Sequence, residues 1–330
     1  MGAGCYPVAG RKIVHSGVRR GSYDPAVTTF PIVFTSGGTP IAGRVHRPPD
    51  SSSSERQPAV VVSGSWLTVK EQMADHYAAA LAARGYTAIT FDFAGWGQSG
   101  GDLRHVELPT RKIADIAAAA RFVSTLSFVR PGRVGYLGVC ATAQYALAAI
   151  AQGAPIASFA SVAGWFHDVA TVAPFYGGTA GVDERLARAE AATDRYLRTG
   201  EIATVPAYAP GDDRAGMFIE MDYYGNPDRG AVPEWPNEMA EMSWLPWLTF
   251  DGLAAAGSAS VPTLFVHSDG CVFPDNIGTL RRRLRGPVDV VWGEGTQTDF
   301  YDRPEQVAFA VDAVDAHFGA TLTAPEEVPA

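Results

Sequence analysis

Apolar residues fall into short continuous runs along most of the chain, with alanine-rich or amphipathic stretches between them. Such runs are typical of parallel strands covered on both faces, and the stretches between them have helical length. The succession predicts an α/β protein with a mostly parallel, doubly wound sheet. Strands are predicted at residues 28–35, 40–46, 58–63, 86–92, 133–139, 156–162, 263–267 and 288–292, and helices at 69–84, 110–126, 141–152, 274–285 and 304–318.

This alternation stops between Gly164 and Ser260. One amphipathic helix is predicted there, at residues 182–198, and aromatic and proline-rich segments follow it. We interpret residues 165–260 as a cap inserted into a core. The core is expected to comprise residues 1–164 and 261–320, and the proline- and glutamate-rich residues 321–330 are expected to form a mobile tail.

Composition narrows the class of protein. The chain has 330 residues, 47% of them hydrophobic, and a formal net charge of -9. This charge argues against a nucleic-acid partner, and no apolar run reaches the ~18 residues of a membrane span. Cys5, Cys140 and Cys271 are far apart and odd in number, so they predict neither a disulfide framework nor a zinc cluster. We therefore expect a cytoplasmic protein with a small-molecule substrate and no metal or other cofactor, and we leave a homodimer open.

Two segments compete for the place of a catalytic nucleophile. Residues 97–101 match the pattern G-x-S-x-G around Ser99, but the preceding strand ends near Asp92 and no helix follows until about Thr110. A Gly-rich turn is the better interpretation of that segment. Residues 138–142 carry Cys140, with a predicted strand running straight into a predicted helix. This is the strand–turn–helix setting of an α/β-hydrolase nucleophile.

The predicted position of Cys140 at a helix N-terminus has a chemical consequence. Free N–H groups and aligned peptide dipoles there stabilise a thiolate, so we expect a lowered pKa and a competent nucleophile. The competing interpretation is a buried core cysteine.

Several short segments resemble the dienelactone-hydrolase-like branch of the α/β-hydrolase superfamily. The resemblance runs from about residue 28 to residue 318. It implies a cytosolic, metal-free α/β-hydrolase with a cysteine or serine nucleophile, an acid and a histidine, in that chain order. The segments are residues 69–73, 92–101, 107–109, 115–116, 137–142, 223–224, 229–230 and 296–302.

The remaining catalytic positions follow from this order. Asp269, after the strand at 263–267, is expected to be the acid, with helix capping as the competing interpretation. Gln297 occupies the position at which the resembling family carries histidine, and an amide cannot accept a proton near neutral pH. His105 and His167 are the alternative bases, although an ordinary loop position is the simpler interpretation of each.

Backbone N–H groups complete the predicted site. The oxyanion hole is expected to use Ala141 together with the loop that contains Trp66 and Leu67, by analogy with the fold. The cap supplies aromatic residues that either line the substrate pocket or form the core of the cap. These residues are Tyr223, Tyr224, Trp244 and Trp247.

A thiol without a histidine favours reactions that do not end in rapid hydrolysis, because water needs a base more than a thiolate does. We expect Cys140 to attack an ester, thioester or lactone carbonyl of a small apolar or polycyclic substrate. Acyl transfer, cyclisation, or carbon–carbon or elimination chemistry in natural-product biosynthesis would follow. The alternatives are an ordinary thiol hydrolase of the dienelactone type with another base, and a catalytically silent ligand-binding protein.

Overall fold

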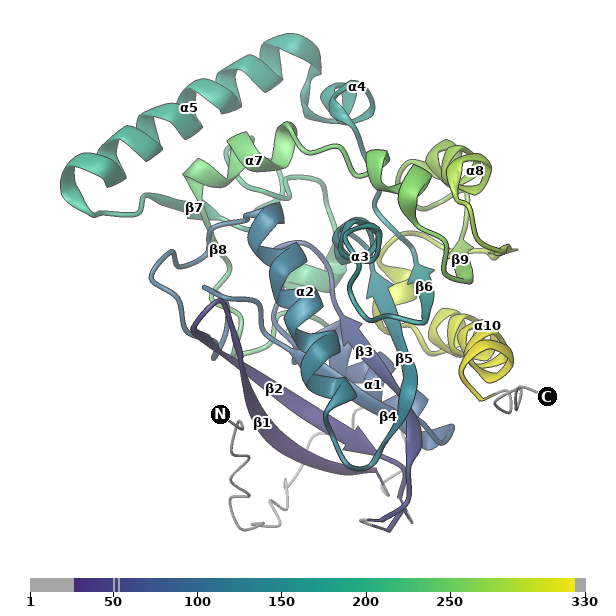
Figure 1. Cartoon of the computed structure of the whole chain (residues 1–330). Helices are drawn as coiled ribbons and strands as arrows, with labels where there is room; N and C mark the ends of the chain where they lie inside the picture. The colour runs from purple at the N-terminus through teal and green to yellow at the C-terminus, as the bar shows by residue number, and fades with distance from the viewer. Residues whose placement is uncertain (1–26, 50, 53, 324–330) are drawn as a thin grey trace.

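The structure is a computed structural model that describes residues 27–49, 51, 52 and 54–323 (Figure 1). Cys5 and residues 324–330 of the expected tail lie outside the described residues. Across the described ranges, no helix is long and apolar enough to cross a membrane.

An eight-stranded sheet forms the centre of the protein, in the order β1-β2-β4-β3-β5-β6-β9-β10. Strand β2 runs antiparallel to both of its neighbours, β1 and β4. The six strands from β4 to β10 in this order run parallel to one another. This confirms the predicted mostly parallel, doubly wound α/β architecture. The strands are β1 (Thr28–Ser36), β2 (Thr39–Arg47), β3 (Gln57–Ser63), β4 (Thr87–Phe91), β5 (Val129–Val139), β6 (Ser158–Val162), β9 (Thr263–His267) and β10 (Val288–Trp292).

Helices cover both faces of this sheet. Helices α1 (Met73–Ala83) and α10 (Pro304–Leu322) pack on one face, and α2 (Pro109–Ser124) and α3 (Thr142–Ala151) pack on the other. Helix α8 (Pro274–Arg283) follows β9, and the short α9 (Asp299–Asp302) precedes α10.

Two helix boundaries differ from the sequence prediction. Helix α1 begins at Met73 rather than at residue 69, because Lys70 is fixed by hydrogen bonds from both its backbone N–H and its Nζ to the Asp92 carboxylate. Helix α10 continues to Leu322, which is fully buried, so the expected tail does not begin at residue 321. An apolar contact therefore sets the end of the last helix.

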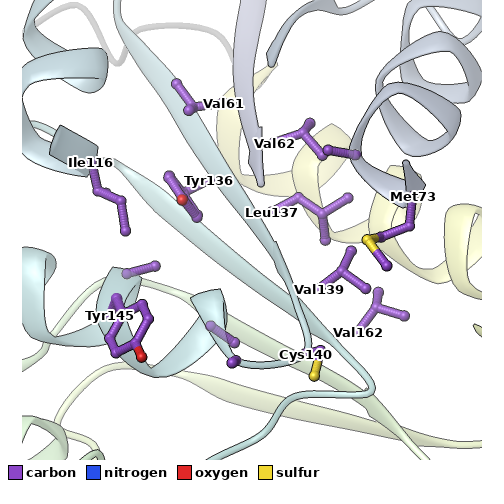
Figure 2. Packing of buried hydrophobic residues seen from close by; sticks show 14 of the residues in the cluster. Val61, Val62, Met73, Ile116, Tyr136, Leu137, Val139, Cys140, Tyr145 and Val162 are labelled. Carbon is purple, nitrogen blue, oxygen red and sulfur yellow. The ribbon is translucent and has the colours of Figure 1, made fainter. Parts of the chain in front are cut away.

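The core fills the space between sheet and helices. Because side chains alternate along a strand, Leu137 and Val139 point to the side of Met73 in α1, whereas Tyr136 points to the side of Ile116 in α2 (Figure 2). All five side chains are buried. The core thus fixes β5, the strand that leads into the site.

Residues between β6 and β9 form the cap region, and its two strands pair with each other rather than with the main sheet. Helices α4, α5 and α7 lie together beyond the end of the core at which α3 begins (Figure 1). The cap elements are α4 (Val169–Val172), η1 (Ala173–Tyr176), α5 (Gly178–Thr199), β7 (Thr204–Pro206), α6 (Asp222–Gly225), β8 (Glu238–Ala240), η2 (Glu241–Ser243), α7 (Trp244–Leu248) and η3 (Ala254–Ser258).

Candidate active site

Cys140 lies at a sharp turn between β5 and α3. Its backbone has φ of 60°, in the left-handed region that a side chain other than glycine rarely adopts. Gly138 allows the turn to close, because a Cβ at this position would fall 2.7 Å from the Cα of Ala143. The local geometry is the strand–turn–helix arrangement expected from the sequence, and Figure 2 shows Cys140 at the end of the strand.

Four hydrogen-bond donors surround the Cys140 sulfur. They are the backbone N–H groups of Ala141 and Trp66 and the hydroxyls of Ser65 and Tyr301. Two of the expected oxyanion donors, Ala141 and Trp66, therefore face the sulfur directly. Each of these groups can donate to the sulfur, and none of them is an imidazole or a carboxylate.

Leu67 does not contribute in the same way. Its backbone is left-handed, with φ of 59°, and its carbonyl accepts a 2.7 Å hydrogen bond from the indole Nε1 of Trp235. Leu67 thereby connects the loop after β3 to the cap, and the backbone N–H of this loop that hydrogen-bonds to Cys140 is that of Trp66.

The expected lowering of the thiol pKa is wrong for this structure. Burial of the sulfur raises the pKa of Cys140 above its ordinary value of 9.0, and the four hydrogen bonds offset only part of this effect. Cys140 is 3% exposed, because the cap covers the helix N-terminus where the thiolate was expected. With the cap in this position the group is a thiol at neutral pH.

Gln297 is held by three side-chain hydrogen bonds. Its Oε1 accepts from the Val272 N–H at 3.1 Å, and its Nε2 donates to the Ala163 carbonyl at 2.6 Å and to the Tyr301 hydroxyl at 3.2 Å. Gln297 therefore approaches Cys140 through Tyr301, which itself contacts the sulfur.

Two cap tyrosines join the same cluster. The Tyr224 hydroxyl donates to Ser65 Oγ at 2.8 Å, and Ser65 Oγ lies 3.4 Å from the Tyr301 hydroxyl. Tyr223 packs edge-on against the Tyr301 ring at 5.1 Å between ring centroids. Of the two cap tyrosines, only Tyr224 places its hydroxyl in this hydrogen-bond cluster, and Tyr223 supports it by packing.

An ion pair fixes the short helix that carries Tyr301. Arg229 Nε donates to Asp302 Oδ2 at 2.9 Å, and its Nη2 donates to the Thr298 carbonyl at 3.1 Å. Asp302 lies in α9 and Thr298 directly precedes it, so the cap residue Arg229 holds the helix of Tyr301 in addition to the contacts from the core.

Asp269 is not brought to Gln297 or to the sulfur cluster. It is exposed, and its Oδ1 accepts a 3.2 Å hydrogen bond from the indole of Trp292 at the surface. The neighbouring Ser268 turns inward instead and donates to the Gly295 carbonyl at 2.6 Å. Asp269, the expected acid, therefore lies at the surface and outside the group of residues around Cys140, because the chain after β9 turns it outward.

Both alternative histidines have other partners. His105 Nδ1 lies 3.0 Å from Glu238 Oε2 in the cap strand β8, and burial lowers its pKa. His167 is fully buried: its Nδ1 accepts from Trp165 Nε1 at 2.7 Å and its Nε2 donates to the Trp247 carbonyl at 3.0 Å. The His105 pair connects a loop of the core to the cap, whereas the His167 contacts lie within the cap region. Neither imidazole is among the four groups that hydrogen-bond to Cys140.

The two cap tryptophans stack against the oxyanion loop. The Trp66 and Trp247 rings are nearly parallel, with centroids 4.3 Å apart, and the Trp244 ring centroid lies 5.9 Å from that of Trp66. Trp247 also donates from its Nε1 to the Tyr176 hydroxyl at 3.1 Å. The residue that supplies a backbone donor to the sulfur therefore also contacts the cap through its ring.

Ser99 has a structural environment. Its hydroxyl donates to the Asp92 carbonyl at 2.6 Å and accepts from the Ala42 N–H at 2.9 Å. Both hydrogen bonds tie the Gly-rich loop to the edge of the sheet, as expected of a turn residue.

The sequence did not identify Ser65 or Tyr301 as site residues. Ser65 lies in the loop after strand β3, the loop that was expected to supply an oxyanion donor. Tyr301 lies in the 296–302 segment that carries the family resemblance. Both residues therefore belong to segments that the sequence had singled out. Within the described part of the chain, no group of three or more His, Cys, Asp or Glu side chains could hold a metal ion.

The sheet order, the helices on both faces and the left-handed turn at Cys140 define the α/β-hydrolase fold. Solved structures agree. The α/β hydrolase GrgF from Penicillium sp. sh18 superimposes with a TM-score of 0.74 at 17% identity, over 90% of this chain and 100% of that one. The hypothetical protein PA2218 from Pseudomonas aeruginosa superimposes with a TM-score of 0.79 at 23% identity, over 94% and 98%.

Sequence comparisons point to the same superfamily. A family model described as X-Pro dipeptidyl-peptidase (S15 family) matches residues 37–200, a range that includes Cys140 but ends before Gln297. PA2218 is 27% identical over 79% of this chain and 72% of its own length. The acyltransferase drtE of Aspergillus calidoustus is 28% identical over 74% of this chain and 80% of its own.

Proposed function

We propose that this chain is an acyl-transfer enzyme in which Cys140 takes an acyl group from an ester, thioester or lactone. The acyl group then passes to a second bound nucleophile, or to a nucleophile within the same molecule, rather than to water. When the nucleophile belongs to the same molecule, the product is a ring. The similarity to a protein named acyltransferase supports this choice among α/β-hydrolase activities.

One observation carries the proposal: the groups that hydrogen-bond to the Cys140 sulfur are two backbone N–H groups and two hydroxyls, with no imidazole or carboxylate among them. Donors stabilise an anionic sulfur or the oxyanion of a carbonyl bonded to it. Water is a weak nucleophile that depends on a strong base for its deprotonation, and hydrolysis of an acyl-enzyme depends on that step. The site therefore favours formation of an acyl-enzyme more than its hydrolysis.

The cap indicates the chemical class of the substrate. Its aromatic rings suit an apolar or polycyclic molecule. The indole Nε1 atoms of Trp66 and Trp244 are buried and have no acceptor among the described residues. A buried unpaired donor is costly, so a ligand that carries carbonyl, ether or hydroxyl oxygens complements these positions. A small oxygenated polycycle of the natural-product type combines both features.

The hydrolase alternative requires a base at the sulfur. His105 pairs with Glu238, and both nitrogens of His167 are engaged by Trp165 and Trp247. Burial also lowers the pKa of His167 to about 4, which makes it a weak base. These contacts favour transfer over hydrolysis.

Mass spectrometry of the intact protein tests the proposal. The chain is incubated with p-nitrophenyl butanoate and, separately, with the butanoyl thioester of N-acetylcysteamine. We expect one butanoyl group on Cys140 that persists until a thiol or amine acceptor is added. Cys140→Ala is expected to lose the adduct while remaining folded.

Cys271→Ala is the matched control, because Cys271 is the other free cysteine of the described residues and is also buried. This variant is expected to keep the adduct. Fast turnover without an adduct would identify a hydrolase instead, and no adduct and no turnover would identify a ligand-binding protein.

A further inference from the structure

The hydrogen bonds around Gln297 fix the direction in which Tyr301 donates. The Val272 N–H donates to Gln297 Oε1, so the amide nitrogen must face Ala163 and Tyr301. A flipped amide would place N–H against N–H and oxygen against oxygen. Since an amide nitrogen only donates, the Tyr301 oxygen accepts, and its own proton points away from Gln297.

Ser65 Oγ lies 3.4 Å from the Tyr301 hydroxyl and already accepts from Tyr224, so we assign that proton to the Cys140 sulfur. Tyr301 and Cys140 are hydrogen-bonded, and Tyr301 is 1% exposed, so solvent does not compete for the hydroxyl. A second chain runs in parallel, from the Tyr224 hydroxyl to Ser65 and from Ser65 to the same sulfur. Both chains end on the sulfur as donors.

The hydroxyl of Tyr301 stays protonated. Burial raises its pKa well above the ordinary value of 10.0, and the nearby sulfur acts in the same direction. A phenol in this state is a poor base. It can nevertheless give up a proton in the same step in which it receives another one.

From this geometry we propose that Tyr301, oriented by Gln297, is the catalytic acid that protonates the leaving group when Cys140 is acylated. The proposal rests on the acyl-transfer function. The leaving atom is bonded to the same carbon that the sulfur attacks, so it lies beside the group that donates to the sulfur. Gln297 is a positioning residue, because it acts through Tyr301.

The step balances without a further reactant. The bond from Sγ to the acyl carbon forms, and the bond from that carbon to the leaving sulfur or oxygen breaks. With substrate bound, the Tyr301 O–H turns from the sulfur to the leaving atom; Tyr301 gives its proton to that atom and accepts the thiol proton of Cys140, so it is again a neutral phenol after the step. When the acceptor nucleophile attacks the acyl-enzyme, its proton passes to Tyr301, and Tyr301 gives its own proton to Sγ. The bond from Sγ to the acyl carbon breaks, and Cys140 is released as a thiol.

Leaving groups of different basicity test this role. An alkyl thiolate is a stronger base than p-nitrophenolate, so its departure gains more from a proton donor. The experiment measures the rate of butanoyl attachment to Cys140 from the N-acetylcysteamine thioester and from p-nitrophenyl butanoate. For Tyr301→Phe we expect a loss of about 100-fold with the thioester and of less than about fivefold with the aryl ester.

Tyr77→Phe is the matched control. The Tyr77 hydroxyl donates to the carbonyl of Phe300, the residue before Tyr301, at 2.6 Å. This variant removes a buried hydroxyl that contacts the same short helix, and the ratio of the two rates is expected to equal that of the unmodified chain. A merely structural effect would slow both probes together.

A second variant tests the same role if Tyr301→Phe does not fold. Gln297→Met removes the group that orients Tyr301, and we expect about a tenfold loss that is confined to the thioester. Equal slowing of both probes in the variants would overturn the role of Tyr301 and leave Cys140 as the nucleophile. Absence of label on Cys140 in the unmodified chain would overturn both the proposed function and this inference.

Discussion

Replacement of Gln297 by histidine is expected to convert the site into a hydrolase by reversing one hydrogen-bond chain. An imidazole can still donate one N–H to the Ala163 carbonyl, which accepts from Gln297 at 2.6 Å. Its other nitrogen then faces the Tyr301 hydroxyl as an acceptor. Tyr301 would donate to the imidazole and accept from the Cys140 thiol, so the proton gains a route away from the sulfur.

The size of the effect follows from the state of the thiol. Since burial raises the pKa of Cys140, the group is a thiol at pH 7 and gains from a base. A general base at this position contributes typically about 10²–10⁴-fold. We therefore expect hydrolysis of p-nitrophenyl butanoate to rise by at least about 100-fold. The loss of the acceptor for the Val272 N–H costs roughly 1 kcal/mol of stability, because Val272 is only partly buried.

The assay follows release of p-nitrophenol and of butanoate by Gln297→His across the neutral pH range. The rate should rise with pH as one imidazole loses its proton, with a midpoint at or below about 6.5, because burial disfavours the charged form. Asp269 is exposed and is not expected to alter this midpoint. Natural transfer should fall, since water competes for the acyl group.

Gln297→Met separates the imidazole from a mere loosening of the site, because it removes the amide without adding a base. If Gln297→Met hydrolyses the ester as fast as Gln297→His does, water entry rather than proton transfer explains the gain. A folded Gln297→His protein that is acylated at Cys140 but hydrolyses at the unmodified rate would refute the hydrogen-bond chain through Tyr301.

Two further predictions concern residues away from the sulfur. Ser99→Ala should leave acylation unchanged but lower the free energy of unfolding by about 1–3 kcal/mol in a denaturant titration, because two buried hydrogen bonds are lost; a loss of acylation with an intact fold would contradict this. For His167, the unfolded imidazole binds a proton below about pH 6.5 and the folded one only below about 4, so acidification through that window should cost about 3 kcal/mol. In His167→Gln the stability should change less over the same window, and an unchanged slope would show that other groups dominate.

The strands and the turn at Cys140 could be predicted because local sequence determines them. Continuous apolar runs specify buried parallel strands, and Gly138 is the small residue that the turn requires. Helix boundaries are less local. Residues 69–72 could continue a helix by composition, but the bonds from Lys70 to Asp92 hold them in another conformation. Leu322 extends α10 because it packs against the position of Gly135.

The hydrogen-bond cluster could not be predicted from local pattern. Ser65 and Tyr301 are 236 positions apart, and only the closed sheet brings them together. Asp269 turns outward where its neighbour Ser268 turns inward and donates to the Gly295 carbonyl. This hydrogen bond joins two separate loops, so no local pattern encodes it. The pKa of Cys140 depends on how deeply the cap covers it, which the helix N-terminus alone does not reveal.

The contact between Trp66 and Trp247 couples substrate entry to the chemistry at the sulfur. Trp66 donates its backbone N–H to Cys140, while its ring stacks on the cap. Since Cys140 is 3% exposed, we expect a substrate to reach the sulfur only when cap and core separate, which would break the stack. Water that enters during such a separation would remove the largest cause of the raised thiol pKa, so we expect the sulfur to be most reactive while the donor arrives. Closure would then bury the site again and protect an acyl-enzyme from water until an acceptor is in place.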